Sequence, residues 1–498
     1  MSFEKLFSPI KIRELELRNR VVMSAMGTHE SAASEDGRMV TDKLIAYHVA
    51  RAKGGCGLNT IEVCSVDAAS APTGFLSIAD DRYIPGMKKL CSAVHAAGGR
   101  VAVQLWQGGL AVASDPQAQI LLPSDMPLSP EYTVPGITEE RIQSVIEAFG
   151  QAARRVVEAG IDVIEFHCAH NYLPHSFLSG GINRRTDGWG GSFENRMRFP
   201  LLVVEKVRAA VGRSFPIDVR ISGSERCEGG MPLEEVAELC VRAQAYVDII
   251  HVSAGVYRDP TTDRMDGPVS PMATGMYPSM YRPNISNLHE AAYIKKRVSI
   301  PVCIVGGIRN ADDAEKIIAE GKVDLVAMGR QLNKADPNFA NKVTAGQADE
   351  IDSCLRCGIC MGGSFTTLRK RDLEELGLKE LPPMGPPLDE NGNVKPVFAG
   401  PFTPAMPEDT DFYAFFKNSP PMQVGPDYCS VNPYHDRKDM MPDGSLPRTH
   451  VVKKILVIGG GMGGMQAAIT TADIGFDVVL AEKERELGGI FRFADHDT

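Results

Sequence analysis

The stretch PVCIVGGIRNADDAEKIIAEGKVDLVAMGR, residues 301–330, decides the fold of most of the chain. An apolar run rich in β-branched residues opens it at 301–305, a helical pattern follows from Asn310, and a second apolar run begins at Asp324. Both runs are continuously apolar rather than alternating, which is typical of parallel strands that are buried on both faces. The stretch therefore predicts a strand–helix–strand unit of a parallel sheet.

The same pattern recurs through the first 330 residues. Six further short apolar runs precede this stretch, at 21–25, 58–63, 101–106, 161–166, 216–221 and 247–252. Helical patterns lie between several of them, at 41–55, 137–160, 232–246 and 310–321. Eight strand-then-helix units favour a closed parallel (β/α)8 TIM barrel. An open doubly wound sheet is the alternative, although such a sheet does not ordinarily need eight units.

Composition excludes several classes of protein. The 498 residues are 43% hydrophobic and 23% charged, and no apolar run approaches the length that spans a bilayer. The first twenty residues alternate charge and hydrophobe, unlike a secretory signal. A net charge of −10 argues against a nucleic-acid surface, which needs a concentrated basic face. We therefore expect a soluble cytoplasmic protein that binds neither nucleic acid nor membrane.

Three regions follow from these patterns. We expect the barrel at 1–345 and a cysteine-containing segment with a proline-rich insertion at 346–450. At 451–498 we expect the start of a dinucleotide-binding fold, as strand, glycine turn, helix and strand. About a hundred further residues would complete such a fold, so we expect an incomplete domain that holds a dinucleotide weakly.

Polar and glycine residues gather where the predicted barrel strands end. Because catalytic groups of a TIM barrel lie at the carboxyl ends of its strands, these residues predict one site. Glycines after the last two strands, with an arginine, suit a phosphate. A glutamine amide matches the imide edge of a flavin, and an arginine would stabilise negative charge on its ring. The candidate cofactor-binding residues are Ala25, Met26, Gly27, Gln104, Arg220, Gly306, Gly307, Gly329 and Arg330.

His167, His170 and Tyr172 follow the fourth apolar run, in FHCAHNYL at 166–173. They allow three interpretations: metal ligands, a catalytic group, or space-filling core residues. A metal site needs third and fourth ligands, and no neighbouring histidine or carboxylate pattern supplies them. Core histidines do not account for a position at the barrel rim, so we favour a catalytic group.

Cys354, Cys357 and Cys360 stand at two-residue gaps in CLRCGIC. Such spacing suits an iron–sulfur cluster or a zinc ion, and either needs a fourth thiolate. The remaining cysteines other than Cys429 are scattered singly among apolar residues, where a small buried side chain is the simpler interpretation.

Gly459, Gly461 and Gly464 form a G-x-G-x-x-G motif between a predicted strand and a predicted helix. Backbone N–H groups and a helix N-terminus there suit a pyrophosphate. Glu482 ends the next predicted strand, where a ribose-binding acid belongs. The motif predicts a dinucleotide site.

Several quoted stretches together resemble the old yellow enzyme family of FMN-dependent oxidoreductases. They are NRVVMSAMGTHES, VQLWQGG, FHCAHNYLPHSFLSGGINRRTDGWGGSFENRMRFP, VRISG and VGGIRN with MGRQ, and the resemblance covers about 340 residues. The cysteines that follow narrow it to the iron–sulfur branch, which includes 2,4-dienoyl-CoA reductase, enoate reductases and trimethylamine dehydrogenase.

The resemblance implies the cofactors and their order. The barrel would bind FMN, the cysteines with Cys429 in CSVNP would hold a [4Fe-4S] cluster, and the glycine motif would bind FAD. NAD(P)H would be the electron source. The chain would associate with further copies of itself or with a separate reductase domain or subunit. His167 and His170 would donate hydrogen bonds to a carbonyl oxygen of an unsaturated small molecule. Tyr172 would protonate its α-carbon while hydride reaches the β-carbon.

Two alternatives to this ene-reductase stay open. The gap of two before Cys360 is of the trimethylamine dehydrogenase type, which favours amine dehydrogenation or demethylation. Against it, His167 stands where that enzyme carries tyrosine, and no cysteine near Gly27 would link a flavin covalently. The other alternative is an electron-transfer subunit, which needs no substrate clamp. The sequence also departs from the family in the stretched gap between Cys360 and Cys429.

Overall fold

A computed structural model of the chain describes residues 3–115, 117–127, 133–227, 230–256, 275–358, 360, 429, 431–432, 449–451 and 453–489. The chain divides into two compact units, Met1–His435 and Asp436–Thr498, and each is described by itself.

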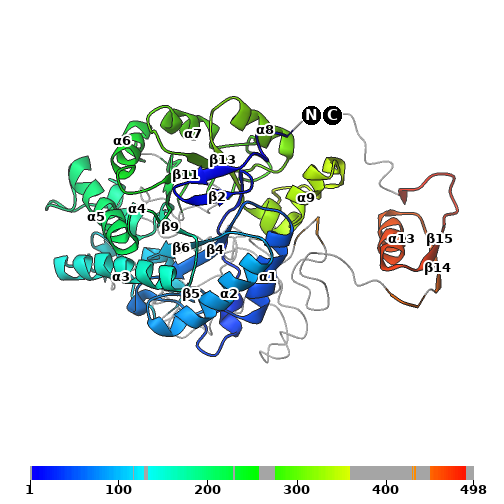
Figure 1. The fold of residues 1–498 in the computed structure, drawn as a ribbon, viewed down its shortest axis with the longest axis horizontal. Helices are drawn as coiled ribbons and strands as arrows, with labels where there is room; N and C mark the ends of the chain where they lie inside the picture. The colour runs from blue at the N-terminus through cyan, green and yellow to red at the C-terminus, as the bar shows by residue number, and fades with distance from the viewer. Residues whose placement is uncertain are drawn as a thin grey trace, which may run out of the picture. The chain divides into compact units, whose positions relative to one another are not determined.

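A closed barrel of parallel strands forms the first unit (Figure 1). Strand β3 pairs with both β4 and β13, so the sheet closes on itself, as the predicted TIM barrel requires and an open sheet does not allow. Among the described residues the eight barrel strands are β3 (Val21–Met23), β4 (Leu58–Ser65), β6 (Val101–Trp106), β9 (Val163–Cys168), β10 (Ile217–Ser222), β11 (Ile249–Ser253), β12 (Val302–Val305) and β13 (Leu325–Met328).

Helices cover the outside of the barrel (Figure 1). Their apolar faces and the outward side chains of the strands form one continuous buried core, which includes Phe149, Phe166 and Phe199. Four of these helices begin where a side chain caps a free N–H, at Thr41, Thr138, Ser192 and Asn310. The helices are α1 (Asp42–Lys53), α2 (Ile84–Ala96), α3 (Glu139–Glu158), α4 (Leu173–Leu178), α5 (Phe193–Val211), α6 (Leu233–Ala243), α7 (Leu288–Lys295), α8 (Ala311–Ala319) and α9 (Phe339–Thr344).

A short hairpin closes the amino-terminal end of the barrel. Strands β1 (Ile10–Ile12) and β2 (Leu15–Leu17) pair antiparallel. Ile12 and Leu17 are buried in a second core with residues at the starts of the barrel strands, such as Leu58 and Leu325. Because this end is filled by apolar side chains, the opposite end is the one left for polar groups.

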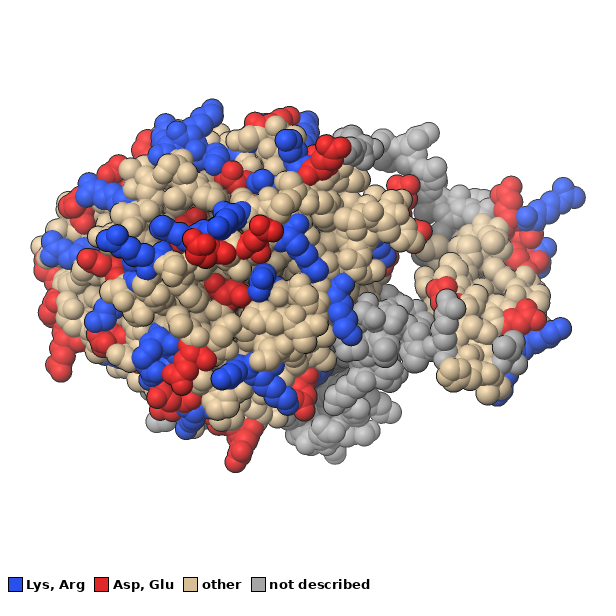
Figure 2. Space-filling model, in the orientation of Figure 1, with Lys and Arg blue, Asp and Glu red and all other residues tan. Residues whose placement is uncertain are grey.

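The surface of the barrel mixes charges of both signs. Lys and Arg lie among Asp and Glu on the face in view (Figure 2). Several form ion pairs, as Arg154 and Arg155 both do with Asp81. No helix in the described ranges combines the length and the apolar character needed to cross a membrane.

The second unit contains the predicted strand, helix and strand. Strands β14 (Lys454–Ile458) and β15 (Asp477–Ala481) pair in parallel, and helix α13 (Met462–Ile474) connects them. Residues of both strands alternate between exposed and half-buried, and α13 has no buried residue.

Candidate active site

Strand β9 delivers the first catalytic candidate. It runs to Cys168, two residues beyond the predicted end, so His167 lies on the strand itself. The chain then turns through His170 and Asn171, whose φ angles of 63° and 62° lie in the left-handed region that residues other than glycine rarely adopt. Tyr172 follows at the start of α4. Strained backbone of this kind often belongs to functional sites, where surrounding contacts hold it in place.

The three candidates lie together. His167 Nε2 is 3.3 Å from His170 Nδ1, and the Tyr172 ring meets the His167 ring edge-on with centroids 4.6 Å apart. Trp106 at the end of β6 packs against Tyr172 at 5.4 Å. His170 Nε2 also lies 2.8 Å from the hydroxyl oxygen of Ser253 on β11. Side chains from three strands therefore converge at the carboxyl end of the barrel.

Both histidines are neutral at physiological pH. Burial lowers the pKa of His167 well below its ordinary value, and the nearby Arg220 lowers it further. The pKa of His170 is lowered in the same way by burial, and next by His167. A neutral imidazole carries one N–H donor and one acceptor nitrogen, so each ring offers a single proton for hydrogen bonding.

Gln104 and Arg220 occupy neighbouring positions inside this end of the barrel. Gln104 on β6 donates its amide N–H to Glu165 on β9. Arg220 on β10 donates from Nη1 to the Ser24 hydroxyl at 3.0 Å, which places it beside the loop that holds Ala25. The Arg220 Nε is buried without a hydrogen-bond partner. A buried donor of this kind is costly unless a ligand accepts from it.

The predicted phosphate group forms at the ends of β12 and β13. Gly306 and Gly307 have φ angles of 149° and 78°, and a Cβ on Gly306 would lie 2.5 Å from Asn287 Nδ2. Arg330 donates to the Pro278 carbonyl from Nη2. Its Nη1 is buried without a partner. Glycine backbone and an unpaired guanidinium nitrogen suit a phosphate.

The loop after β3 completes the set. A Cβ on Gly329 would lie 3.5 Å from the Met26 sulfur, and one on Gly27 would lie 3.5 Å from Phe75. Strand closure therefore brings Met26 beside Gly329, one of the predicted phosphate glycines. Gln104, Arg220 and the glycines with Arg330 fit a flat, phosphorylated ligand that has a hydrogen-bonding edge. FMN is such a ligand. The individual roles of these residues stay predictions.

The four predicted cysteine ligands line one small cavity that is partly open to solvent. Burial raises the pKa of Cys360 and Cys429, while Lys334 and Arg330 act to lower the pKa of Cys360. These two cations line the same cavity. A set of four thiols beside cations fits a thiolate-bound cluster, because thiolates rather than thiols bind metal.

The glycine motif is assembled in the second unit. Gly459 has a φ of 105°, and a Cβ on Gly464 would lie 1.7 Å from the Gly459 carbonyl oxygen, so both positions need glycine. Gly461 caps α13 without a side chain. The Glu482 carboxylate accepts the Gly460 N–H. The four predicted residues thus surround the turn from β14 into α13.

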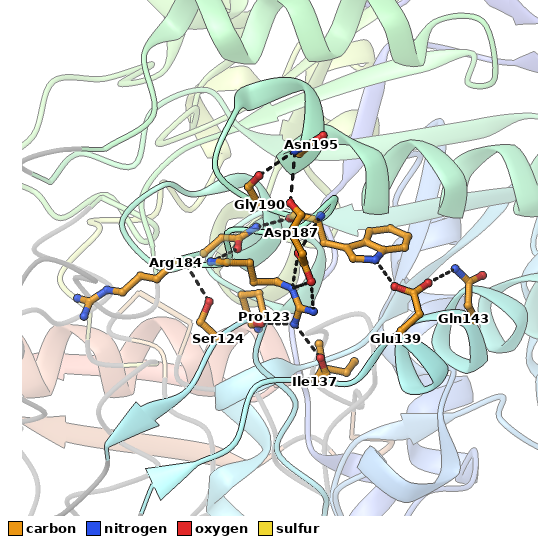
Figure 3. A network of polar contacts seen from close by, with 12 residues as sticks. Pro123, Ser124, Ile137, Glu139, Gln143, Arg184, Asp187, Gly190 and Asn195 are labelled. Carbon is orange, nitrogen blue, oxygen red and sulfur yellow. Dashed lines mark hydrogen bonds and ion pairs between the residues drawn. The ribbon is translucent and has the colours of Figure 1, made fainter.

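A polar network fixes the loop that follows α4 (Figure 3). Arg185 donates to the Pro123 and Ile137 carbonyls at 2.9 and 2.8 Å and pairs with Asp187 at 2.6 Å. Trp189 donates its indole N–H to Glu139 at the start of α3. These contacts join the loop after α4 to the start of α3 and to the backbone at Pro123 and Ile137.

Sequence reasoning missed three buried charged residues inside the barrel. Glu165, Asp218 and His251 come from β9, β10 and β11, and each is at most 3% exposed. Lys334, beside the cysteines, was missed as well. The available signal was a polar residue inside an otherwise apolar run, as in VIEF and IDVRI.

Comparison with known proteins identifies the family. Residues 5–350 match the sequence profile of the NADH:flavin oxidoreductase / NADH oxidase family, and residues 454–495 match that of an FAD binding domain. The chain is 36% identical over 500 residues to the NADH oxidase of Thermoanaerobacter brockii, which covers 99% of this chain and 65% of that protein.

Two further relatives differ in their named reactions. N,N-dimethylglycine/sarcosine dehydrogenase of Chromohalobacter salexigens is 32% identical, over 98% of this chain and 62% of that protein. The solved structure of 2-naphthoyl-CoA reductase with 2-naphthoyl-CoA aligns with a TM-score of 0.74 at 25% identity, over 98% of this chain and 66% of that chain.

The chain spans 62–66% of the length of these three relatives. The barrel, the assembled rim and the two matching profiles agree with one another. The chain is therefore a flavoprotein that belongs to the NADH:flavin oxidoreductase / NADH oxidase family, in the iron–sulfur branch of the old yellow enzymes.

Proposed function

We propose that the chain is the flavin- and cluster-bearing part of an NAD(P)H-dependent ene-reductase. Its substrate would be a small molecule with an activated C=C bond, of the enoate, enone or enoyl-CoA type. The observation that supports this most is the buried group of His167, His170 and Tyr172 at the carboxyl end of a barrel of this family.

The tautomer of His167 favours donation to a substrate. The Ala169 backbone N–H donates to His167 Nδ1 at 3.3 Å, so the neutral ring carries its proton on Nε2. That nitrogen faces His170. A carbonyl oxygen within reach of both nitrogens would accept from His167 Nε2–H, and donation there withdraws electrons from the conjugated C=C bond.

His170 is held so that it completes this clamp. When the Ser253 hydroxyl donates to His170 Nε2, the His170 proton sits on Nδ1 and faces the same oxygen. Tyr172 then provides a phenol proton for the α-carbon. Bound FMN would supply the hydride for the β-carbon, and Gln104 and Arg220 are the residues that would hold its ring.

Cys354, Cys357, Cys360 and Cys429 are the residues that would hold a [4Fe-4S] cluster, which relays single electrons. The shared cavity and the adjoining cations support this assignment. A zinc ion would suit the same four thiols, and metal analysis separates the two. Glu482 and the glycine motif would hold FAD, through which NAD(P)H electrons enter.

Amine dehydrogenation is the second candidate. The 32% identity to N,N-dimethylglycine/sarcosine dehydrogenase and the cysteine spacing favour it. In that reaction the flavin accepts electrons from the substrate instead of donating them. The direction of flavin oxidation therefore separates the two functions.

The test uses the purified chain under anaerobic conditions. Chemically reduced protein is mixed with enoates, enones or enoyl-CoA thioesters. Oxidised protein is mixed with tertiary amines. We expect alkenes to reoxidise the flavin, whereas bleaching by amines alone would support the second candidate. Tyr172→Phe should slow reoxidation by about 10²–10⁴-fold with FMN still bound, the usual contribution of a general acid. Tyr293→Phe on α7 is the matched control, and equal rates in both variants would remove Tyr172 from the mechanism.

Iron analysis tests the cluster separately. Cys360→Ser should lose the iron and the broad visible absorbance of a cluster, and Cys227→Ser, outside the cysteine cavity, should retain both. Zinc in place of iron in the wild-type chain would contradict the cluster assignment.

A further inference from the structure

A line of buried hydrogen bonds crosses the barrel interior and ends on Gln104. Gln104 and Glu165 are partners across β6 and β9, and Glu165 and Asp218 are partners across β9 and β10. Glu165 accepts the Gln104 amide N–H with one oxygen. Its other oxygen lies 2.7 Å from His251 Nδ1, and Asp218 lies 3.4 Å from the same nitrogen. None of the four is more than 3% exposed.

Glu165, Asp218 and His251 lie close enough together to be considered as metal ligands. The separation of 2.7 Å between His251 Nδ1 and the Glu165 oxygen is that of a hydrogen bond. Two tetrahedral ligands on one zinc ion would lie about 3.3 Å apart, given metal–ligand distances of about 2.0–2.1 Å. The cluster is therefore a proton-sharing network.

The contacts of the network favour opposite charges on Glu165 and His251. Burial alone would lower the pKa of His251, but Cys303, Glu165 and Asp218 raise it well above its ordinary value. Burial alone would raise the pKa of Glu165, but His251 and Arg220 hold it below its ordinary value. These contacts favour a Glu165 carboxylate beside a protonated His251.

An ionised carboxylate fixes which way the Gln104 amide points. A carboxylate only accepts hydrogen bonds, so the atom of Gln104 that faces Glu165 must be the amide nitrogen. The amide oxygen of Gln104 is then left for another donor. The imide N–H of a flavin is such a donor. If the Gln104 amide were flipped, its NH2 group would face the imide N–H, and two donors cannot form a hydrogen bond.

We propose that Glu165 is a positioning residue of the flavin site, which orients the Gln104 amide so that its oxygen meets the imide edge of the ring. His251 and Asp218 hold Glu165 in place. This inference rests on the proposed binding of FMN in the barrel. It assigns Glu165 no contact with substrate or flavin, so its effect passes through Gln104.

Two variants change the positioning in different ways. Glu165→Gln keeps the shape but supplies an N–H, so Gln104 is free to flip. Glu165→Asp keeps the charge but draws the carboxylate back by one methylene. We expect each to weaken FMN binding about tenfold or more, the effect of losing a hydrogen bond to a charged partner, and to shift the flavin midpoint potential. Asp218→Asn, one contact further away, should have a smaller effect.

The decisive measurement repeats both variants in a Gln104→Ala background, with FMN affinity and midpoint potential as readouts. If Glu165 acts through Gln104, its substitution changes little once Gln104 is removed. Wild-type affinity and potential in both single variants would overturn the proposal, and so would an undiminished effect in the Gln104→Ala background. Should Glu165→Gln fail to fold, Glu165→Asp and its double variant decide the question alone.

The wild-type chain is measured first. If it takes up no FMN, the proposed function and this inference fall together. If it binds FMN but does not reduce alkenes, only the proposed reaction fails, because neither readout depends on a substrate.

Discussion

The barrel and the strand–helix–strand unit at 454–481 share one local pattern and differ in what covers it. All six residues of β9 are buried, whereas those of β14 alternate between exposed and half-buried. Leu456 on β14 is 60% exposed, and Phe166 on β9 is fully buried. The same sequence signal thus forms parallel strands in both places. Only in the barrel do closure and the surrounding helices remove both faces of the strands from water.

The difference extends to how each region builds a site. In the barrel the candidate residues are buried side chains, such as His167, that converge from separate strands. In the second unit the candidate site is a backbone turn around Gly459 and Gly464. We therefore expect substitutions to act on barrel stability through packing, and to act in the second unit through local backbone geometry. The two tryptophans of the chain, Trp106 and Trp189, both lie in the first unit, so tryptophan fluorescence reports barrel unfolding.

The largest effect should come from the core. Phe166→Ala removes a fully buried ring that packs edge-on against Phe149 with centroids 5.3 Å apart. We expect a loss of about 3–5 kcal/mol in the free energy of unfolding, as for other buried aromatic truncations. Urea unfolding followed by tryptophan fluorescence measures it.

The matched substitution in the second unit is Leu456→Ala. Because Leu456 is exposed and outside the barrel, the fluorescence transition should move by less than about 0.5 kcal/mol. A shift comparable to that of Phe166→Ala would show that the barrel depends on the second unit.

Gly54 in the barrel and Gly464 in the second unit leave almost equally little space for a Cβ atom, so they allow a matched comparison of the two regions. A Cβ on Gly54 would lie 1.8 Å from the Pro337 carbonyl oxygen, and one on Gly464 would lie 1.7 Å from that of Gly459. Gly54→Ala should destabilise the barrel by about 1–3 kcal/mol, because backbone must move. Gly464→Ala should leave the fluorescence transition unchanged and alter amide exchange only around its own turn. A barrel that tolerates Gly54→Ala would contradict this account of close packing.

A buried histidine of the barrel should make stability depend on pH. Burial lowers the pKa of His48 to about 4, although the Asn59 hydrogen bond opposes the shift. The unfolded chain takes up this proton near pH 6.5 and the folded chain only near pH 4, so stability falls as pH drops through that window. Between pH 7 and pH 5 the wild type should lose about 2 kcal/mol more than His48→Gln.

The control for this prediction is His450→Gln. Because His450 lies in the second unit, this substitution should leave the tryptophan fluorescence transition of the barrel as in the wild type at each pH. Unfolding curves at pH 7, 6 and 5 decide the matter. Parallel profiles for His48→Gln and wild type would show that His48 titrates alike in both states.

The smallest effect concerns helix capping. The Thr41 hydroxyl accepts the Leu44 N–H at 3.2 Å at the start of α1, whereas Gly461 begins α13 without any side-chain cap. Thr41→Ala should cost about 1 kcal/mol of barrel stability, and Thr41→Ser should restore most of it. If Thr41→Ala leaves the free energy of unfolding in urea unchanged, the Thr41 cap does not stabilise α1. The starts of α1 and α13 would then not differ in side-chain capping.

Much of the fold could be predicted because it is written in local periodicity. All eight barrel strands overlap the apolar runs that predicted them, and the glycine motif lies between its strand and helix. The ends of the strands were less well predicted. Strand β9 runs to Cys168, because pairing with β6 and β10 extends the strand past its apolar run. The positions of His167, His170 and Tyr172 at a strand end placed them at the rim before any coordinates.

The sequence by itself determined the strand and helix pattern, the spacing of the cysteines and the chemical character of the rim. Only the tertiary structure decided that Gln104, Glu165, Asp218 and His251 form one line of hydrogen bonds, and that Cys429 shares a cavity with Cys360. The physical reason is that periodicity reports which face of an element is apolar, whereas contacts between distant segments depend on barrel closure and strand register. A charged residue within an apolar run has no explanation in the sequence, because its partner lies on a neighbouring strand.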